Sequence, residues 1–151
     1  MIKKNLSIIV TLIALLIFVA CGNHVDESVK SLDEIRTLSN NKYQVISAKT
    51  AKHFIDLAIL EKGFEDGSFV VVDVRTTAEF MDEHIPNAIN IPNETIESLK
   101  PRGLTNVNAI VLVYCRSGNR SKDAAKKLIN LGYHYVFDFG GINSWPYEKV
   151  K

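Results

Sequence analysis

The chain alternates between continuous apolar runs and segments whose apolar residues recur with helical spacing. Residues 69–74 and 109–114 are almost entirely apolar and rich in β-branched side chains, which is typical of strands buried on both faces. Residues 47–61, with Ile59 on the apolar face, and residues 121–131 space their apolar side chains as amphipathic helices do. Strands that alternate with helices predict an α/β fold, with a central parallel sheet covered by helices on both faces.

Weaker signals complete the expected order of elements. Thr76 and Glu79 have the spacing of a capping box, which predicts a short helix directly after the first buried strand. Asn93 is expected to cap a helix ending near Pro101, and a terminal helix is expected around Trp145. Short strands are expected at residues 43–46, 88–91 and 135–139.

The N-terminus has the pattern of an export signal. Two lysines precede the apolar run at residues 6–20, which is shorter than the about 20 apolar residues of a typical transmembrane helix. Residues 18–22, Phe-Val-Ala-Cys-Gly, resemble the bacterial lipobox, although Phe18 stands where that pattern usually has Leu. The resemblance implies that residues 1–20 are a lipoprotein signal peptide and that Cys21 is acylated. An uncleaved helix and simple secretion are the alternatives.

The segment that follows is expected to be a tether. Residues 21–41 are polar and charged, with a weak helical pattern at 32–38, and they lead into a folded domain expected at 42–151. An acylated Cys21 would place this domain in the bacterial cell envelope, anchored in the lipid membrane and facing outside the cytoplasm.

Charge and cysteine content narrow the possibilities further. The formal net charge is +1, and removal of the predicted signal peptide leaves 16 basic and 17 acidic residues. This balance gives no reason to expect a nucleic-acid partner. The chain has two cysteines, Cys21 and Cys115. A lipidated Cys21 cannot form a disulfide, so Cys115 would be left as a free thiol in a compartment that is often oxidising, which points to a reactive residue.

Cys115 lies in a sequence pattern that is typical of a reactive cysteine. It ends a buried strand and precedes a loop, Arg116, Ser117, Gly118, Asn119 and Arg120, which leads into a helix. Backbone N–H groups of such a loop can form a concave anion site, and the start of the following helix adds unpaired donors. Two arginines add positive charge. We therefore expect the pKa of the Cys115 thiol to be lowered, which would make it a nucleophile at neutral pH.

The loop is similar to the active-site loop of the rhodanese family, Cys-Arg-x-Gly-x-Arg. Three further stretches resemble motifs of that family in the same order and spacing, with Asn87 and Glu83 standing where the family usually has Gly. Asn tolerates the left-handed backbone, so the turn at Asn87 can survive. The stretches are Asp73-Val74-Arg75 with Glu79-Phe80, the segment from His84 to Pro92, and Gly140-Gly141 followed by Trp145.

The resemblance implies a three-layer rhodanese-like fold and sulfur transfer. Cys115 would take sulfur from a small donor such as thiosulfate, form a persulfide, and pass the sulfur to a thiol or to cyanide. The loop from Arg116 to Arg120 would bind the substrate. No cofactor is implied, and no residues have the spacing of a metal site. Asp73, Arg75 and His84 are interpreted as supporting residues that orient loops through hydrogen bonds.

Two alternatives remain at this point. Cysteine phosphatases share the thiolate, the cradle of N–H groups and the arginine, but their arginine lies six positions after the cysteine. Here that position is Ser121, and Arg120 comes one residue earlier, so the loop is shorter and suits a single sulfur atom better than phosphate. The other alternative is a non-enzymatic binding or redox-sensing module, which the retained Cys115 and its arginines disfavour.

Overall fold

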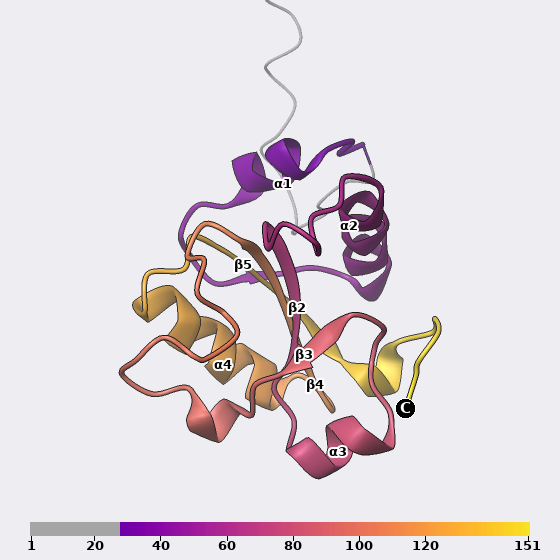
Figure 1. Ribbon diagram of the computed structural model, residues 1–151, viewed down its shortest axis with the longest axis vertical. Helices are drawn as coiled ribbons and strands as arrows, with labels where there is room; N and C mark the ends of the chain where they lie inside the picture. Colours follow the sequence, from indigo (N-terminus) through magenta and orange to yellow (C-terminus); the bar gives the residue numbers. More distant parts are fainter. Residues whose placement is uncertain (1–27) are drawn as a thin grey trace, which may run out of the picture.

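The computed structural model describes residues 28–151, which form a five-stranded parallel sheet between helical layers. The strand order is β1-β5-β4-β2-β3, so the two most apolar strands lie at the centre or next to it. Figure 1 shows the helices on either side of the sheet. The elements are α1 (Leu32–Leu38), β1 (Gln44–Val45), α2 (Ala48–Leu60), β2 (Phe69–Asp73), α3 (Thr77–Asp82), β3 (Ala88–Asn90), η1 (Asn93–Thr95), β4 (Ile110–Cys115), α4 (Asn119–Asn130), β5 (Tyr135–Gly141) and η2 (Ile142–Ser144).

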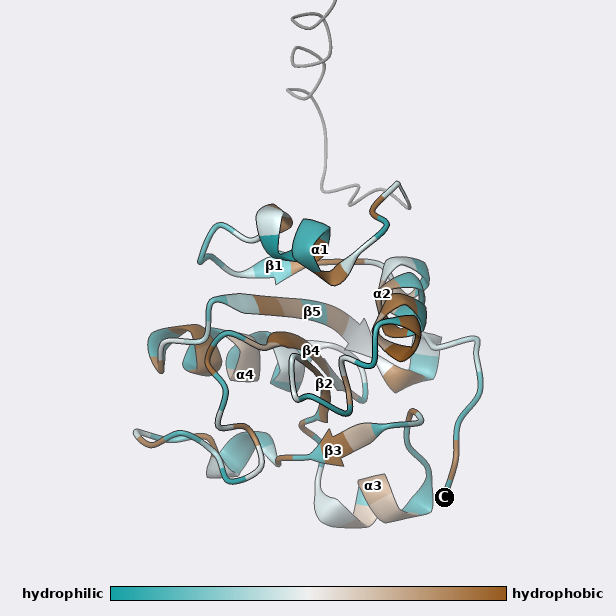
Figure 2. Cartoon of the chain, turned by 45° about the horizontal axis from the view of Figure 1, so that its top comes forward, coloured by the Kyte–Doolittle hydropathy of each residue, from teal (hydrophilic) through white to brown (hydrophobic). Residues whose placement is uncertain are grey.

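The side chains of β4 point alternately to the two faces of the sheet, and the core accordingly has two halves. Leu112 and Tyr114 face the side covered by α1 and α2, whereas Val111, Val113 and Cys115 face α4. Every residue of this strand is buried, which explains its continuous apolar sequence. Figure 2 shows the same arrangement, with hydrophobic strands enclosed between helices whose outer faces are hydrophilic. The predicted α/β fold, a parallel sheet covered on both faces, is confirmed.

The segment expected to be a tether is in part a packed component of the domain. Leu32 and Ile35 of α1 are 4% and 0% exposed and join the core beneath α2. The polar composition of residues 28–41 did not predict this packing. A helix needs only one narrow apolar face to pack against a core. Among the described residues, packing against the core thus includes α1 and the buried Val29, which precede the expected domain boundary at residue 42. The predicted signal peptide and Cys21 lie outside the described residues.

Two expected helices are absent from residues 28–151. Asn93 begins a single 3-10 turn, and its side chain binds α4 by donating to Asp123 and accepting from Lys127. A side chain used in this way does not cap a longer helix. Trp145 is extended and follows the 3-10 turn η2, because a residue before proline, here Pro146, disfavours the helical backbone.

Local hydrogen bonds cap the first turns of α2 and α3. Ser47 caps α2 by accepting a hydrogen bond from the Thr50 N–H, and the capping box of Thr76 and Glu79 is present at α3. Ile59 was expected on the buried face of α2, but it is 55% exposed, because α2 turns that side to solvent near its end. None of the helices within residues 28–151 is long and apolar enough to cross a bilayer.

Candidate active site

Cys115 lies at the carboxyl end of β4, at the edge of the sheet where α3 is also found (Figure 1). The loop after it closes over the sulfur, and the N–H of Gly118 points at Sγ from 3.0 Å. Gly118 has φ of 106°, a backbone conformation that a residue with a side chain rarely adopts. Gly118 directs its N–H at the sulfur and also precedes the first turn of α4. The loop and the start of the helix therefore surround Sγ with hydrogen-bond donors.

The Cys115 side chain is almost fully enclosed. It is 1% exposed, and its Sγ lies 3.7 Å from the hydroxyl of Ser121, which is itself fully buried. The carbonyl oxygens of Gly118 and Gly140 lie 3.1 and 3.2 Å from the Ser121 hydroxyl, which can donate its one proton to either, so Ser121 connects the loop to the end of β5. Sequence reasoning counted Ser121 only as the position where a phosphatase would have arginine. Its place in the first turn of α4, directly after the loop, is the signal that could have identified it.

The pKa of the Cys115 thiol is lowered from its ordinary value. Burial acts in the opposite direction and is the largest single influence, but hydrogen bonds from Ser121, Gly118 and Ser117 together outweigh it. The lowered pKa agrees with the expectation from the sequence. The causes that lower it are hydrogen bonds around the sulfur, one of the features named from the sequence together with the charge of the two arginines.

The two arginines of the loop have different surroundings. Arg120 makes a bidentate ion pair with Glu79, with nitrogen–oxygen distances of 2.7 and 2.9 Å. This pair lowers the pKa of Glu79 to about 2. Arg116 is exposed, as are Ser117 and Asn119. Arg116 thus remains open to solvent, while Arg120 fastens the loop to α3.

Glu79 is a site residue that sequence reasoning did not select. It closes the capping box at Thr76 and simultaneously binds Arg120, so one carboxylate joins the start of α3 to the start of α4. The capping box with Thr76 was by itself enough to explain an acidic residue at position 79, so the sequence suggested no second role. Its second role depends on a contact between residues 41 positions apart, which a local pattern does not reveal.

Hydrogen bonds to Sγ lower the pH at which Cys115 becomes a reactive thiolate. In a chain carrying Cys21→Ala, where Cys115 is the remaining cysteine, the rate of alkylation should rise with pH to a midpoint below that of a free cysteine. Ser121→Ala should move the midpoint upward, because the hydrogen bond from the Ser121 side chain to the thiolate is lost while that from its backbone N–H remains. Arg120→Ala should move it less. A shift in Arg120→Ala without one in Ser121→Ala would show that charge, and not the Ser121 hydrogen bond, stabilises the thiolate.

Gly141 allows β5 to pass directly against the active-site loop. A Cβ at this position would lie 2.3 Å from the carbonyl oxygen of Arg116 and 2.7 Å from Cα of Ser117. Both neighbours are backbone atoms, so they cannot move aside as a flexible side chain could. The backbone of Asn143 also donates to the Arg116 carbonyl, at 3.3 Å. The Gly-Gly element noted in the sequence thus supports the loop by its lack of a side chain.

Gly141→Ala is expected to displace the loop and to slow alkylation of Cys115. Overpacking against backbone should lower the free energy of unfolding by about 1–3 kcal/mol. Gly67→Ala is a suitable control, since its Cβ meets open space and the variant strains only a left-handed backbone (φ of 71°) far from Cys115. Urea unfolding and alkylation rate would be measured on both. Unchanged alkylation in Gly141→Ala would show that the close contact does not position the loop.

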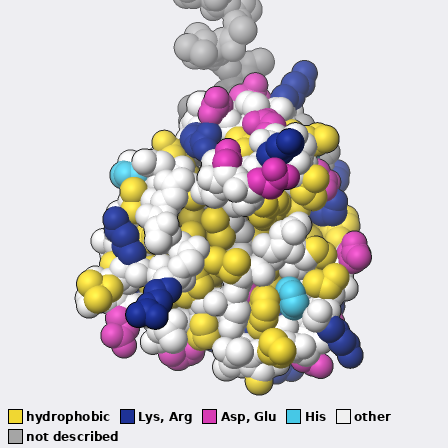
Figure 3. Space-filling view, in the orientation of Figure 1, with side chains coloured by type: hydrophobic (Ala, Val, Ile, Leu, Met, Phe, Trp, Pro, Cys, Tyr) yellow, Lys and Arg dark blue, Asp and Glu magenta, His cyan; other side chains and the backbone are white. Residues whose placement is uncertain are grey.

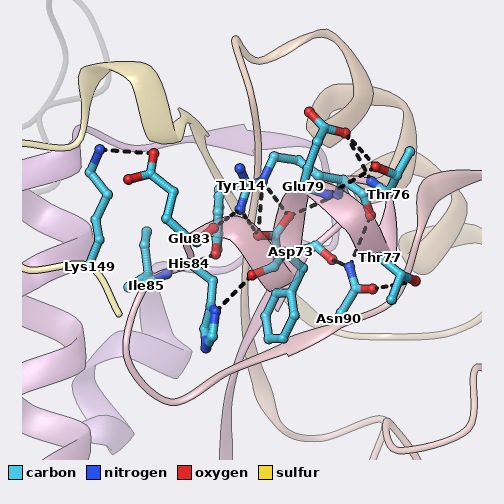
Figure 4. Close-up of polar contacts among 12 residues, drawn as sticks. Asp73, Thr76, Thr77, Glu79, Glu83, His84, Ile85, Asn90, Tyr114 and Lys149 are labelled. Carbon is cyan, nitrogen blue, oxygen red and sulfur yellow. Dashed lines mark hydrogen bonds and ion pairs between the residues drawn. The ribbon is translucent and has the colours of Figure 1, made fainter. Parts of the chain in front are cut away.

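Asp73 and Arg75 form a buried ion pair beside β4. The Arg75 guanidinium lies 2.6 Å from the Asp73 carboxylate, and the side chains of Arg75 and Asp73 are 5% and 0% exposed, respectively. Arg75 also donates to the carbonyl of Glu83 and lies over the ring of Tyr114, whose hydroxyl accepts from the Ile85 N–H. Figure 4 shows these contacts converging between β2 and the segment that follows α3. The pair supports the loops around the site without touching Sγ.

His84 is held in place by both its ring and its backbone. The ring stacks on Phe80 with centroids 3.9 Å apart, and Nδ1 lies 2.9 Å from the Phe80 carbonyl. Its backbone pairs with Val150 near the end of the chain. These contacts come from α3 and the C-terminal segment. Across residues 28–151, no group of three His, Cys, Asp or Glu residues could hold a metal ion.

The fold and this site define an α/β domain in which the loop after a strand-end cysteine directs backbone N–H groups at its sulfur. Residues 56–147 match the family model described as rhodanese-like domain. The chain therefore belongs to the rhodanese-like domain family, as the motifs had suggested.

Several known proteins share this similarity. The chain is 34% identical over 80 residues to thiosulfate sulfurtransferase PspE of Escherichia coli, an alignment that covers 53% of this chain and 77% of PspE. It is 40% identical over 84 residues to the adenylyltransferase and sulfurtransferase UBA4 of Candida albicans, covering 50% of this chain but 19% of that protein.

Solved structures give the same result. A rhodanese with anions from E. coli is 32% identical with a TM-score of 0.51, and the match covers 55% of this chain and 98% of that one. A rhodanese-related protein from Thermoplasma volcanium is 31% identical with a TM-score of 0.52, covering 72% of this chain and 98% of that one.

Proposed function

We propose that this protein is a sulfurtransferase in which Cys115 carries sulfane sulfur as a persulfide. The observation that carries the proposal is the sulfur at the end of β4, 3.0 Å from the Gly118 N–H and enclosed by the loop that begins α4. Similarity to a thiosulfate sulfurtransferase supports thiosulfate or a small persulfide as the donor, and a thiol or cyanide as the acceptor.

The reaction has two half-reactions. The Cys115 thiolate attacks the outer sulfur of the donor, a new S–S bond forms, and the donor's S–S bond breaks, so that sulfite leaves with the bonding electron pair when thiosulfate is the donor. The terminal sulfur of the persulfide then carries the negative charge. An acceptor thiolate or cyanide attacks that sulfur, and the Cys115 thiolate leaves.

The residues around Cys115 have distinct roles in this scheme. Loop N–H groups and the start of α4 stabilise the negative charge on the thiolate and on the persulfide. Arg116, which is exposed, binds the anionic part of the donor. Glu79 holds Arg120 and thereby keeps the loop closed around the sulfur. The enclosure favours a single terminal sulfur over a tetrahedral phosphate, as the short loop had suggested.

Intact-mass analysis tests the proposal directly. The full chain carrying Cys21→Ala would be treated with thiosulfate, and the expected result is one added sulfur atom that disappears when cyanide is supplied. Because that variant retains only Cys115, the added atom has a single possible site. Absence of the adduct with thiosulfate and with small persulfides would favour the binding-module alternative. Faster hydrolysis of an aryl phosphate than transfer of sulfur would favour a phosphatase.

We further propose that the protein is anchored in the membrane of the bacterial cell envelope through an acylated Cys21. The lipobox-like residues 18–22 support this location, which the apolar run before them also favours. Wild-type protein should partition into detergent and float with vesicles, and Cys21→Ala should do neither. Recovery of the wild-type chain as an unmodified soluble species would disprove the anchor.

A further inference from the structure

Asp138 is a buried carboxylate of β5 that has no part in the reaction scheme above. Most charged side chains lie on the surface, where Figure 3 shows acidic and basic groups interspersed. Asp138 is 2% exposed. The buried Asp73 is paired with Arg75, whereas Asp138 accepts from two neutral donors, the Tyr43 hydroxyl at 2.7 Å and the Gly140 N–H at 2.9 Å. A carboxylate is costly to bury, so these two bonds indicate which part of the chain it holds.

Gly140 lies in a bulge of β5 beside the reactive cysteine. Val113 pairs with Asp138, whereas Cys115 pairs with Gly141. β5 thus advances by three residues where β4 advances by two, so β5 contains one extra residue here. Gly140 has φ of 85°, a conformation that glycine adopts readily. Oδ1 of Asp138 accepts from the Gly140 N–H within this bulge, and the carboxylate therefore fixes the bulged backbone.

The bulge supports the active-site loop from below. A Cβ built on Gly118 would lie 3.6 Å from Cα of Gly140, so these two backbone segments lie against each other. Gly141 packs in the same way against Cα of Ser117. The backbone N–H groups of Ser117 and Gly118 are among the donors that lower the pKa of the Cys115 thiol. Displacement of the bulge would therefore move these donors away from the sulfur.

Asp138 is itself held by neighbouring elements. Side chains of β5 point alternately to the two faces of the sheet, which turns Asp138 toward α4, the side that also carries Cys115. Its carbonyl accepts from the Ile46 N–H at 2.9 Å, and Lys126 of α4 lies over the Tyr43 ring. Burial and the bond to Asp138 raise the pKa of the Tyr43 hydroxyl, so Tyr43 stays a donor throughout the pH range in which a cysteine titrates.

We propose that Asp138 is a positioning residue of the active site: by holding Gly140, its carboxylate keeps the bulge of β5 against the active-site loop and the loop N–H groups directed at the sulfur. This inference deepens the proposed sulfurtransferase function and rests on it. The hydrogen bonds of Asp138 go to Gly140, Tyr43 and Ile46, so its effect on the reaction passes through the backbone.

The pH dependence of Cys115 alkylation tests this role in the full chain carrying Cys21→Ala, here called the parent chain. Asp138→Ala removes the acceptor of the Gly140 N–H, and the loosened loop should raise the midpoint toward that of a free cysteine. Loss of the carboxylate charge alone would do the opposite, because a nearby negative group disfavours a thiolate. Asp138→Asn removes the charge but keeps an acceptor, so its midpoint should stay at or below that of the parent chain. Sulfur transfer at neutral pH should slow in Asp138→Ala and recover in Asp138→Asn.

Two controls distinguish this role from a general loss of stability. Tyr133→Phe removes a different buried hydrogen bond, to the Leu104 carbonyl beyond the C-terminal end of α4, and should leave the midpoint unchanged. The double variant Asp138→Leu with Tyr43→Phe replaces a hydrogen-bonded pair by apolar side chains of similar shape. It should fold even if Asp138→Ala does not, and it should raise the midpoint. Urea unfolding would establish which variants are folded.

The outcomes separate the role of Asp138 from the proposed function. If Asp138→Ala and the double variant titrate at or below the midpoint of the parent chain, the role of Asp138 is disproved even when the parent chain takes up sulfur. An equal rise in Asp138→Asn or in Tyr133→Phe would disprove it too, because both variants keep an acceptor for the Gly140 N–H. If the parent chain takes up no sulfur, the proposed function is wrong, and with it the role of Asp138 in catalysis.

Discussion

Replacement of Cys115 by serine is expected to abolish sulfur transfer while leaving the fold intact. A hydroxyl fits the same space and can accept the hydrogen bond from the Gly118 N–H, but it cannot carry a persulfide. Transfer from thiosulfate to cyanide should fall by a factor on the order of 10⁴ or more, as expected for removal of a nucleophile. The free energy of unfolding should change by about 1 kcal/mol or less, since the loop hydrogen bond is retained.

The other cysteine supplies the matched control. Cys21→Ser removes the second thiol of the chain and should leave transfer at the wild-type rate when the proteins are assayed in detergent. Urea unfolding would establish that Cys115→Ser is folded. Retention of transfer in Cys115→Ser would place the reactive sulfur elsewhere and overturn the proposed mechanism.

The sequence predicted those parts of the molecule that depend on local patterns. The two continuous apolar runs became β2 and β4, and the cysteine, glycine and helix start became the cradle around Sγ. Asn87 adopts φ of 64°, as expected of an asparagine at a turn where the resembling family motif usually has glycine. These features are encoded within a few residues of one another, so a periodicity or a turn preference is enough to identify them.

Contacts between distant segments escaped prediction. The role of Glu79 in fastening Arg120 and that of Ser121 in joining the loop to Gly140 exist only when the sheet brings their elements together. The docking of α1 has the same origin, because its two buried side chains look unremarkable in a polar segment until α2 provides a surface for them. Tertiary packing, and not local preference, decides such positions.

The second large effect is expected from Asp73→Ala. This change leaves the guanidinium of Arg75 buried without its carboxylate, and Arg75 is only 4% exposed. Removal of one partner of a buried ion pair typically destabilises a protein by about 3–5 kcal/mol, because the remaining charge is left without compensation. Transfer should also fall, since Arg75 would no longer hold the segment after α3 through the Glu83 carbonyl.

Two further variants distinguish a lost charge partner from a general loss of packing. Asp33→Ala removes the carboxylate of an exposed pair with Arg36, and its effect on unfolding should be small because solvent screens that pair. The double variant Asp73→Leu with Arg75→Met removes both buried charges and should be less destabilised than Asp73→Ala alone. Urea unfolding of the three proteins gives the comparison. If the double variant is the least stable of them, the cost arises from lost packing and hydrogen bonds, and the buried charge of Arg75 is not its cause.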